Sequence, residues 1–465
     1  MSNKRISLGE LARRNMLLGC RFGVWCFLGL CYLAPQSLMA MTLYEAYHLS
    51  RSRDPSYLSA QANRKVADAL VRQSLSGYMP SVVAVAEVNS SYPSPPVAPV
   101  SAQEPLPKKW YTDDAFSISA KESLFDAKVS KAVSSARLRA QAYAYKVQGS
   151  EYDLVTRLVD AYFSVLGAHE KLESLSARRR VILEQMRQAQ KRFEAGSATI
   201  ADVQYSQAQY SLSTADIVSA QAVERSSQAA LRIFVGQEFD KIDSLSLDDL
   251  GPLSIKAINY PLAYWTSTAR LKSPLIRSQE LLLMAAKNDI SLQKAGHFPT
   301  LEVTVSSRYD SVGLTSAGVG ESQPDMFVGV KVTLPLFLGG SIAAKVDEYI
   351  HKSVAVYEDY RKTYNQVSLM TEQSYLNFRN GLNHINALKT AMASARTSLS
   401  ANQLGYRTGT RILLDVLTAE NQVYNLSSQL VDEIISTLKA YINLKIYAGV
   451  FSDEDLKFVD SCLVD

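Results

Sequence analysis

The sequence predicts a mainly α-helical protein with a membrane β-barrel, built from one helix–strand–strand–long helix–helix unit that occurs twice. Three observations lead to this fold class: turn sequences that recur, two long stretches without proline, and four segments in which apolar and polar residues alternate. The repeated unit is roughly 210 residues long, which exceeds a solenoid repeat and therefore indicates a duplicated domain. The first copy spans residues 41–250, and the second spans 251–465 with a short C-terminal tail.

Three pairs of turn sequences define the duplication. The sequence GYMP at 77–80 recurs as GHFP at 296–299, FEAGS at 193–197 recurs as YRTGT at 406–410, and FVG at 234–236 recurs as YAG at 447–449. These turns keep the same order in both copies. Each copy therefore contains a helix, a strand pair, a long helix and a returning helix in the same succession.

Residues 1–40 differ in composition from the rest of the chain. Basic residues precede an apolar run at 22–33, and the small residue Ala40 follows. This order is typical of a secretory signal peptide, whereas the run is short for the alternative, an N-terminal membrane anchor. The formal net charge of +4 lies in this segment, so the exported chain is neutral and nucleic acid is not an expected partner.

Cysteine usage agrees with export. Cys20, Cys26 and Cys31 would leave with the signal peptide, and Cys462 would remain. A single cysteine cannot form an intrachain disulfide in an oxidising compartment. The sequence LLGC at 17–20 is also similar to a lipoprotein processing site, although charged residues, rather than an apolar stretch, precede it. Beyond the signal peptide no segment has the uninterrupted apolar length of a spanning helix, so any membrane-embedded part would consist of strands.

The long helices are assigned from proline spacing. Proline is absent from 108–251 and after residue 335, and a helix interior tolerates it poorly. Long helices are therefore predicted at 127–194 and 341–404, each roughly 100 Å long at about 1.5 Å per residue. A long antiparallel coiled coil would have the same composition of alanine, glutamine and leucine, but it does not explain the strands.

Each long helix ends at a glycine turn, Gly196 or Gly409, after which a shorter helix returns at 201–235 or 412–448. A returning helix of roughly 50 Å covers only half of the outbound one. The helices that precede the strands can continue the line by stacking end to end on the returning helices. These are predicted at 57–75 and 275–294.

Four strands are predicted at 81–92, 112–125, 300–309 and 327–337. Apolar and polar residues alternate in each, which puts the apolar side chains on one face. Alternation alone fits any half-buried sheet, but these strands are also flanked by aromatic residues and joined in pairs by polar loops, which is typical of an outer-membrane barrel wall. The polar face would line the barrel lumen with the charged residues Glu87, Lys121, Glu302, Arg308 and Lys331.

Four strands cannot close a membrane barrel, whose smallest members have about eight, and open sheet edges in lipid are very costly. Several chains must therefore share one barrel. Three chains would give about twelve strands and twelve continuous lines of helix. A ring of about twelve strands and a ring of about twelve helices both leave a pore, and the two pores can be coaxial. By the same argument, two or four chains would also close a barrel.

Two groups of motifs lie at the turns between the long and the returning helices. The first is RFEAG at 192–196 with IADVQ at 200–204 and QAQY at 207–210, and the second is GYRTGTR at 405–411 with LDVL at 414–417. They closely resemble the two tip turns of the TolC family of outer-membrane efflux proteins. The sequence LPLFLGG at 334–340 is similar to the family's strand-to-helix junction, and DAYFSVL at 160–166 to its long helix. The resemblance extends from about residue 41 to residue 449.

The resemblance implies a homotrimeric channel-tunnel, in which a twelve-stranded β-barrel in the outer membrane of a Gram-negative bacterium continues into a twelve-helix periplasmic α-barrel that is closed at its tip. Such a protein docks onto a periplasmic adaptor (a membrane fusion protein) and an inner-membrane pump of the RND, MFS or ABC class. The expected function is the passive exit duct of a tripartite efflux or type I secretion system. The alternative is a periplasmic coiled-coil scaffold without a pore.

The resemblance also implies a gate. In the family, a tyrosine and an arginine on one tip turn bond to an aspartate on the other turn or subunit, and Tyr406, Arg411 and Asp202 occupy those positions here. Ala201 stands where the best-known member has threonine, so one gate bond is expected to be missing. From the residues alone, Asp202 equally fits a helix-capping box with Thr199, while Tyr406 and Arg411 fit a packing aromatic and a solvated cap.

Asp415 matches the first aspartate of the family's entrance ring, whose carboxylates favour cations, whereas Thr418 replaces the second. We therefore expect one ring of carboxylates and a weaker cation preference. The turns are also the expected adaptor-docking tips, and they depart from the valine–glycine forms of the best-known member, so the cognate adaptor is expected to differ. The docking residues are Ala195, Gly196, Ser197, Thr408, Gly409 and Thr410.

No catalytic, metal or cofactor site is predicted, and the protein is not expected to be an enzyme. The histidines are scattered without metal-ligand spacing, and no zinc motif, phosphate-binding loop or dinucleotide fingerprint occurs. Carboxylates lie on long helix faces beside basic residues such as Arg178, Arg179 and Arg180, which is typical of a solvated surface. The sequence does not distinguish drug efflux from protein secretion.

Overall fold

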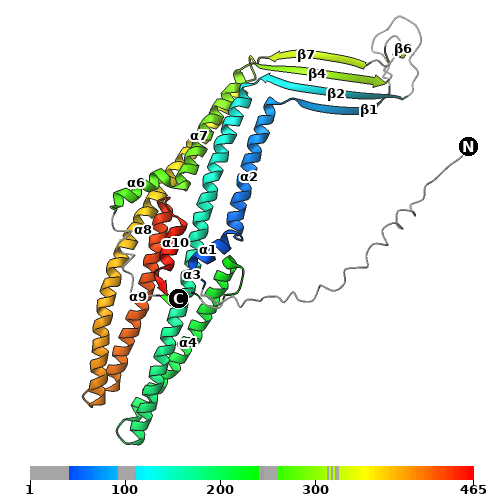
Figure 1. Cartoon of the computed structure of the whole chain (residues 1–465). Coiled ribbons are helices and arrows are strands. Elements are labelled where there is room, and N and C mark those ends of the chain that lie inside the picture. The colour runs from blue at the N-terminus through cyan, green and yellow to red at the C-terminus, as the bar shows by residue number, and fades with distance from the viewer. Residues whose placement is uncertain are drawn as a thin grey trace, which may run out of the picture.

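The computed structural model describes residues 41–92, 110–239, 242, 244–245, 260–311, 314–315, 318–319 and 324–464. The predicted signal peptide, with its three cysteines and the LLGC sequence, lies outside the described residues. Figure 1 shows two long helical hairpins that run in the same direction, with their turns at one end and a β-sheet projecting from the other end.

The described elements occur in the same order in the two copies. The first copy contains α1 Leu43–Arg51, α2 Pro55–Leu75, the 3₁₀ helix η1 Ser76–Tyr78, β1 Ser81–Ser91, β2 Tyr111–Phe125, α3 Ala127–Glu194 and α4 Ile200–Val235. The second contains α6 Leu262–Lys272, α7 Pro274–Lys294, η2 Ala295–His297, β4 Thr300–Ser311, β7 Pro324–Thr333, α8 Ser341–Arg407 and α9 Leu413–Tyr447. The other described elements are α10 Asp453–Asp460 and the short strands β3 Ser244–Leu245, β5 Leu314–Thr315, β6 Gly318–Val319 and β8 Leu463–Val464.

The helix α3 has 68 residues, which corresponds to roughly 100 Å. Its start is capped by Asp126, whose side chain accepts a hydrogen bond from the Lys128 N–H. Its end is followed by Gly196, which adopts a φ of 71°. Because an L-amino acid with a side chain rarely adopts this conformation, glycine suits the reversal into α4.

The helix α8 has 67 residues and begins after Gly340, whose φ is 80°. It continues to Arg407, past the predicted end at 404, because the chain does not reach a left-handed residue until Gly409 with a φ of 76°. The shorter helices α2 and α7 start at Pro55 and Pro274, slightly earlier than predicted, since proline suits the first position of a helix.

The shorter helices lie along the long ones: α2 and α4 both pack against α3, α9 packs against α8, and α7 packs against both α3 and α8. At the first junction, the Arg53 guanidinium donates a hydrogen bond to the carbonyl oxygen of Val235 (2.5 Å). At the second, the chain at Gly449 approaches α6 and α7 so closely that a Cβ atom there would lie 2.5 Å from the carbonyl oxygen of Lys272. Each returning helix is thus continued by the helix that precedes a strand pair.

The four long strands form one antiparallel sheet in the order β1-β2-β4-β7. Within the described residues, β1 and β7 each pair on one side only, so the sheet has two open edges. The strand predicted at 327–337 was misplaced, because β7 starts at Pro324 and ends at Thr333. The chain leaves the ladder there because Pro335 has no N–H to donate, and positive φ values at Gly339 and Gly340 then turn it into α8.

The strand register separates two chemically different faces. Across one row of the sheet, Val82 lies opposite Ala120, Ala120 opposite Val305, and Val305 opposite Val328. Val82 and Val328 are exposed in the single chain. The charged residues that were predicted to line a lumen all fall on the opposite face, because side chains alternate along each strand. They are Glu87, Lys121, Glu302, Arg308 and Lys331.

The largest core lies partway along the hairpins, where α1 packs against α3 and α4, and α10 packs against α9 (Figure 1). Tyr162 and Phe163 of α3, Phe378 of α8, and Ile434 of α9 are fully buried in it. Cys462 is also buried there, and it forms no disulfide within the described part of the chain. Among the described residues, no helix combines enough length with enough apolar character to cross a membrane.

Candidate functional site

The candidate site is formed by the turns of the two hairpins, which lie at the same end of the molecule (Figure 1). Both turns have the same backbone geometry. The Ser197 N–H donates to the Arg192 carbonyl oxygen (2.7 Å), and the Thr410 N–H donates to the Gly405 carbonyl oxygen (2.8 Å). The residues predicted to dock an adaptor are all exposed at these turns. They are Ala195, Gly196 and Ser197 on the first turn, and Thr408, Gly409 and Thr410 on the second.

Asp202 forms a complete capping box at the start of α4. Its Oδ2 accepts hydrogen bonds from the Thr199 N–H (3.0 Å) and hydroxyl (2.7 Å), while the Asp202 N–H donates to the Thr199 Oγ1 (3.2 Å). These bonds satisfy N–H groups that a helix start otherwise leaves without partners. The capping interpretation of Asp202 is therefore confirmed, and its role in a gate stays a prediction.

Tyr406 connects the two hairpins within one chain. The guanidinium carbon of Arg192 on α3 lies 4.3 Å from the centre of the Tyr406 ring on α8, which is a close cation–π contact. The ring also packs against a small buried cluster formed by Ala189 of α3 with Leu413 and Leu417 of α9. Tyr406 is therefore a packing aromatic, as one of the two interpretations predicted.

Arg411 precedes α9 and pairs with Asp415 in the first turn of that helix, where the Arg411 Nη1 lies 3.9 Å from the Asp415 Oδ2. The same carboxylate accepts a longer hydrogen bond from the Ile412 N–H (3.4 Å), so Asp415 caps α9 as Asp202 caps α4. Both members of the Arg411–Asp415 pair are partly exposed. Within the described residues of a single chain, no hydrogen bond or ion pair joins Asp202 to Tyr406 or Arg411.

Above the turns, a polar contact between the hairpins was missed by the sequence analysis. Glu420 of α9 is 5% exposed, and its Oε2 accepts a hydrogen bond from the Gln185 side chain of α3 (2.8 Å). At the next residue of α9, the side-chain oxygen of Asn421 accepts a hydrogen bond from the Arg178 guanidinium of α3 (2.5 Å). Burial raises the pKa of Glu420, opposed by hydrogen bonds from Gln185 and Gln403 and by the charge of Arg178.

A signal for this contact was present in the sequence. Glu420 follows Leu413, Val416 and Leu417 at helical spacing, and all four residues are buried on one face of α9. A carboxylate on the apolar face of a helix is unusual, because burial of its charge is costly without partners. Carboxylates on these helices had been interpreted as solvated, and that interpretation is wrong for Glu420.

At the other end of the molecule, the polar face of the sheet carries an ion pair between strands. The Nζ of Lys121 on β2 lies 3.9 Å from the Oε1 of Glu302 on β4, and Glu302 lies opposite Lys331 on β7. These side chains are partly exposed in the single chain, so the pair is weak by itself. Lys121, Glu302 and Lys331 lie on the same face of the sheet, as expected for residues that line a lumen.

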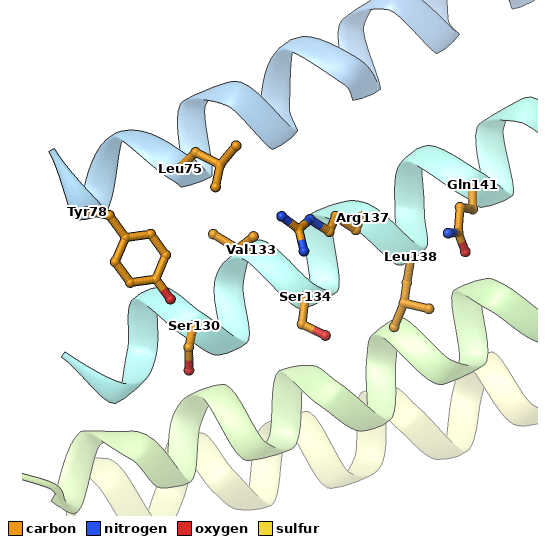
Figure 2. Close-up of a pocket in the computed structure, with 8 residues that line it drawn as sticks. All are labelled: Leu75, Tyr78, Ser130, Val133, Ser134, Arg137, Leu138 and Gln141. Carbon is orange, nitrogen blue, oxygen red and sulfur yellow. The ribbon is translucent and has the colours of Figure 1, made fainter. Parts of the chain in front are cut away.

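A groove lies on the helices near the sheet, and most of its lining residues are uncharged. The groove in Figure 2 has a volume of about 320 Å³ and lies between α2 and α3, with Arg137 as its charged residue. Its other lining residues are Leu75, Tyr78, Ser130, Val133, Ser134, Leu138 and Gln141. Among the residues that the structure describes, no group of three or more histidine, cysteine, aspartate or glutamate side chains could hold a metal ion.

Comparison with known proteins gives consistent matches along the chain. A family model described as outer membrane efflux protein matches residues 46–237 and 265–450. The chain is 27% identical to the outer membrane protein TolC of Vibrio cholerae over 92% of this chain and 95% of that protein. It is 25% identical to the alkaline protease secretion protein AprF of Pseudomonas aeruginosa, over 94% of this chain and 91% of that protein.

Solved structures share the fold. A structure of CusC has a TM-score of 0.75 at 16% identity, covering 89% of this chain and 93% of that chain. The outer membrane protein VceC from Vibrio cholerae has a TM-score of 0.73 at 19% identity, covering 88% of this chain and 96% of that chain. Each of these similarities covers most of both chains, and the family model matches residues in both copies of the unit.

Proposed function

Because this chain belongs to the outer membrane efflux protein family, we propose that it is an outer-membrane channel that provides the exit duct of an efflux or type I secretion system. The match covers both copies of the duplicated unit. Its relatives include proteins named for each use, since TolC of Escherichia coli and the protease secretion protein PrtF of Dickeya chrysanthemi both match more than 90% of this chain. The protein lies in the outer membrane and extends into the periplasm.

The sheet is the observation that carries the proposed architecture. It has four strands, one apolar face, and open edges at β1 and β7 within the described residues. An open edge cannot remain unpaired in lipid, because each unsatisfied backbone group there costs several kcal/mol. The edge β7 of one chain therefore pairs with β1 of the next, and three chains complete a barrel of about twelve strands. The apolar face contacts lipid, and the charged face lines the lumen.

The helices continue this barrel into the periplasm and close it at the tips. In the assembled ring, the turns of neighbouring chains lie close together, and Arg411 and Tyr406 bond to Asp202 across that contact. Charge-assisted hydrogen bonds of about 1.5 to 3 kcal/mol each can hold the tips together and still yield to a binding partner. A periplasmic adaptor and an inner-membrane pump supply that binding at the exposed turns, and Asp415 provides one carboxylate per chain at the entrance.

Two experiments test the proposed function. Purified protein in planar lipid bilayers is expected to conduct ions, and the outer-membrane fraction is expected to contain trimers that resist heating in SDS. A protein that assembles but conducts no ions under any condition would instead support the periplasmic scaffold. To separate the two uses, the gene is deleted, and drug sensitivity is compared with the secretion of individual proteins into the medium.

A further inference from the structure

Glu420 lies in the contact between the two hairpins of one chain, away from the turn residues that were proposed to join neighbouring chains. Glu420 lies on α9, its partner Gln185 lies on α3, and Gln403, which also hydrogen-bonds to it, lies on α8. The carboxyl group therefore lies in the contact between the two hairpins. The two hairpins of one chain therefore cannot separate at this level without exposing Glu420 to water.

The group that donates to Glu420 contains an acceptor that an ionised carboxylate cannot satisfy. The Gln185 Oε1 is buried and has no hydrogen-bond partner in the described structure. An acceptor in this position needs a donor, because a buried polar atom without one costs about 1–3 kcal/mol. A protonated carboxyl group supplies a donor beside this oxygen, whereas an ionised carboxylate has none.

The charges that surround Glu420 do not compensate its burial. On α3, the charge of Arg178 acts on the carboxylate, but the Arg178 guanidinium donates its hydrogen bond to Asn421, and Arg180 acts on Tyr424. On α8 the facing group is the neutral Gln403, and on α9 it is the half-buried Tyr424. Within the described residues, no ion pair joins Glu420 to a base, so the buried site favours the neutral acid.

We propose that Glu420 is a further gating residue that holds a proton while the two hairpins are packed together and releases it when they separate. The inference rests on the proposed function as a gated channel. In the packed tip Glu420 is neutral and keeps the hydrogen bond that it accepts from the Gln185 side chain, with its acid hydrogen available to the Gln185 Oε1, whereas in the open tip it is solvated and ionised. Acid in the periplasm therefore holds the tip closed, and a rise in pH favours opening.

The direction of the pH dependence follows from the linkage between proton binding and channel closure. The closed state binds the proton more tightly than the open state, because burial raises the pKa of Glu420 above its usual range only when the hairpins are packed. Stabilisation of the closed state is therefore complete at acidic pH and is lost as the pH rises through the raised pKa. Each unit of pKa difference between the two states allows up to about a tenfold change in the ratio of closed to open channels.

The test measures channel conductance in planar bilayers between about pH 5 and pH 8 for the wild type, Glu420→Gln and a matched control. Glu420→Gln keeps the shape and the hydrogen-bonding groups but cannot ionise, so we expect its channels to stay closed and its conductance not to rise with pH. The control is Glu184→Gln, which removes an exposed carboxylate one residue from Gln185 and is expected to behave as the wild type. Glu420→Met, which also carries no charge, serves if Glu420→Gln does not assemble.

Infrared difference spectra between the two pH limits provide a second readout. The wild type is expected to show the C=O band of a protonated carboxyl group that is lost at the higher pH and is absent from Glu420→Gln. A Glu420→Gln channel with the pH response of the wild type would overturn the assignment, even if the channel itself works. If neither the wild type nor the double variant Tyr406→Phe, Arg411→Ser conducts at any pH, the proposed function itself fails.

Discussion

The guanidinium of Arg192 stacks on the ring of Tyr406 at 4.3 Å, so the two hairpin turns of a single chain are already joined before any second chain is present. The Tyr406 hydroxyl is not part of that stacking contact. The ring can therefore hold the hairpins together within the chain while the hydroxyl bonds to a neighbouring chain. Variants that keep the ring and remove the hydroxyl separate these two roles.

The first prediction concerns the gate between chains. The double variant Tyr406→Phe, Arg411→Ser keeps the stacking with Arg192 but removes the proposed bonds to Asp202. Loss of even one charge-assisted bond of about 1.5–3 kcal/mol shifts the closed-to-open ratio by roughly tenfold or more, so we expect single-channel conductance to rise. Arg187→Ser, which removes an exposed arginine of α3, is the matched control. Unchanged conductance in a correctly assembled double variant would contradict the gate assignment.

The second prediction separates the two roles of Asp202. Thr199→Ala weakens the capping box by about 1 kcal/mol but leaves the Asp202 carboxylate in place. Asp202→Asn removes the charge and keeps the size of the side chain. If Asp202 closes the channel, Asp202→Asn raises conductance and Thr199→Ala lowers only thermal stability. Equal effects of the two variants on conductance would indicate that Asp202 acts only as a helix cap.

The third prediction concerns ion selectivity. Asp415 is the carboxylate that each chain is expected to place at the entrance, and Thr418 instead donates its hydroxyl to the Leu414 carbonyl oxygen (2.8 Å). We expect a modest cation preference that Asp415→Ala removes, because a ring of carboxylates concentrates cations at a narrow entrance. Reversal potentials in a salt gradient measure it, with the exposed Asp216→Ala on α4 as the control. Strong cation selectivity that survives Asp415→Ala would refute this role.

The fourth prediction concerns the two faces of the sheet. Val330 and Lys331 are neighbours on β7, but Val330 shares the apolar face and Lys331 the charged face. Val330→Lys places a charge against lipid, which costs about 2–4 kcal/mol near the middle of the membrane, and we expect fewer heat-resistant trimers in the outer membrane. Lys331→Gln changes the lumen and is expected to assemble normally. The opposite pattern would mean that the faces are reversed.

Much of the fold follows from local sequence signals. The start of α3 was predictable because Asp126 is a good cap, and its end because a glycine follows where a left-handed residue is required. The strands were predictable from alternation, since their register then puts every predicted lumen residue on one face. In these segments the local preference and the final contacts agree.

Features that depend on contacts between distant residues were not predictable. The helices α1, α6 and α10 were missed, and the Asp460 carboxylate of α10 accepts hydrogen bonds from the Leu43 and Tyr44 N–H groups at the other end of the chain. Glu420 was missed for a similar reason, because its burial depends on α3 packing against α9. The end of β7 was misplaced because alternation continues past Thr333 although Pro335 cannot join the ladder.

We propose that separate chains combine their sheets to close one barrel. Native mass spectrometry of the exported protein, released from detergent after purification from the outer membrane, measures the number of chains directly. We expect a single species with the mass of three chains, in which the edges β1 and β7 of neighbouring chains are paired. A species with the mass of one chain would contradict it.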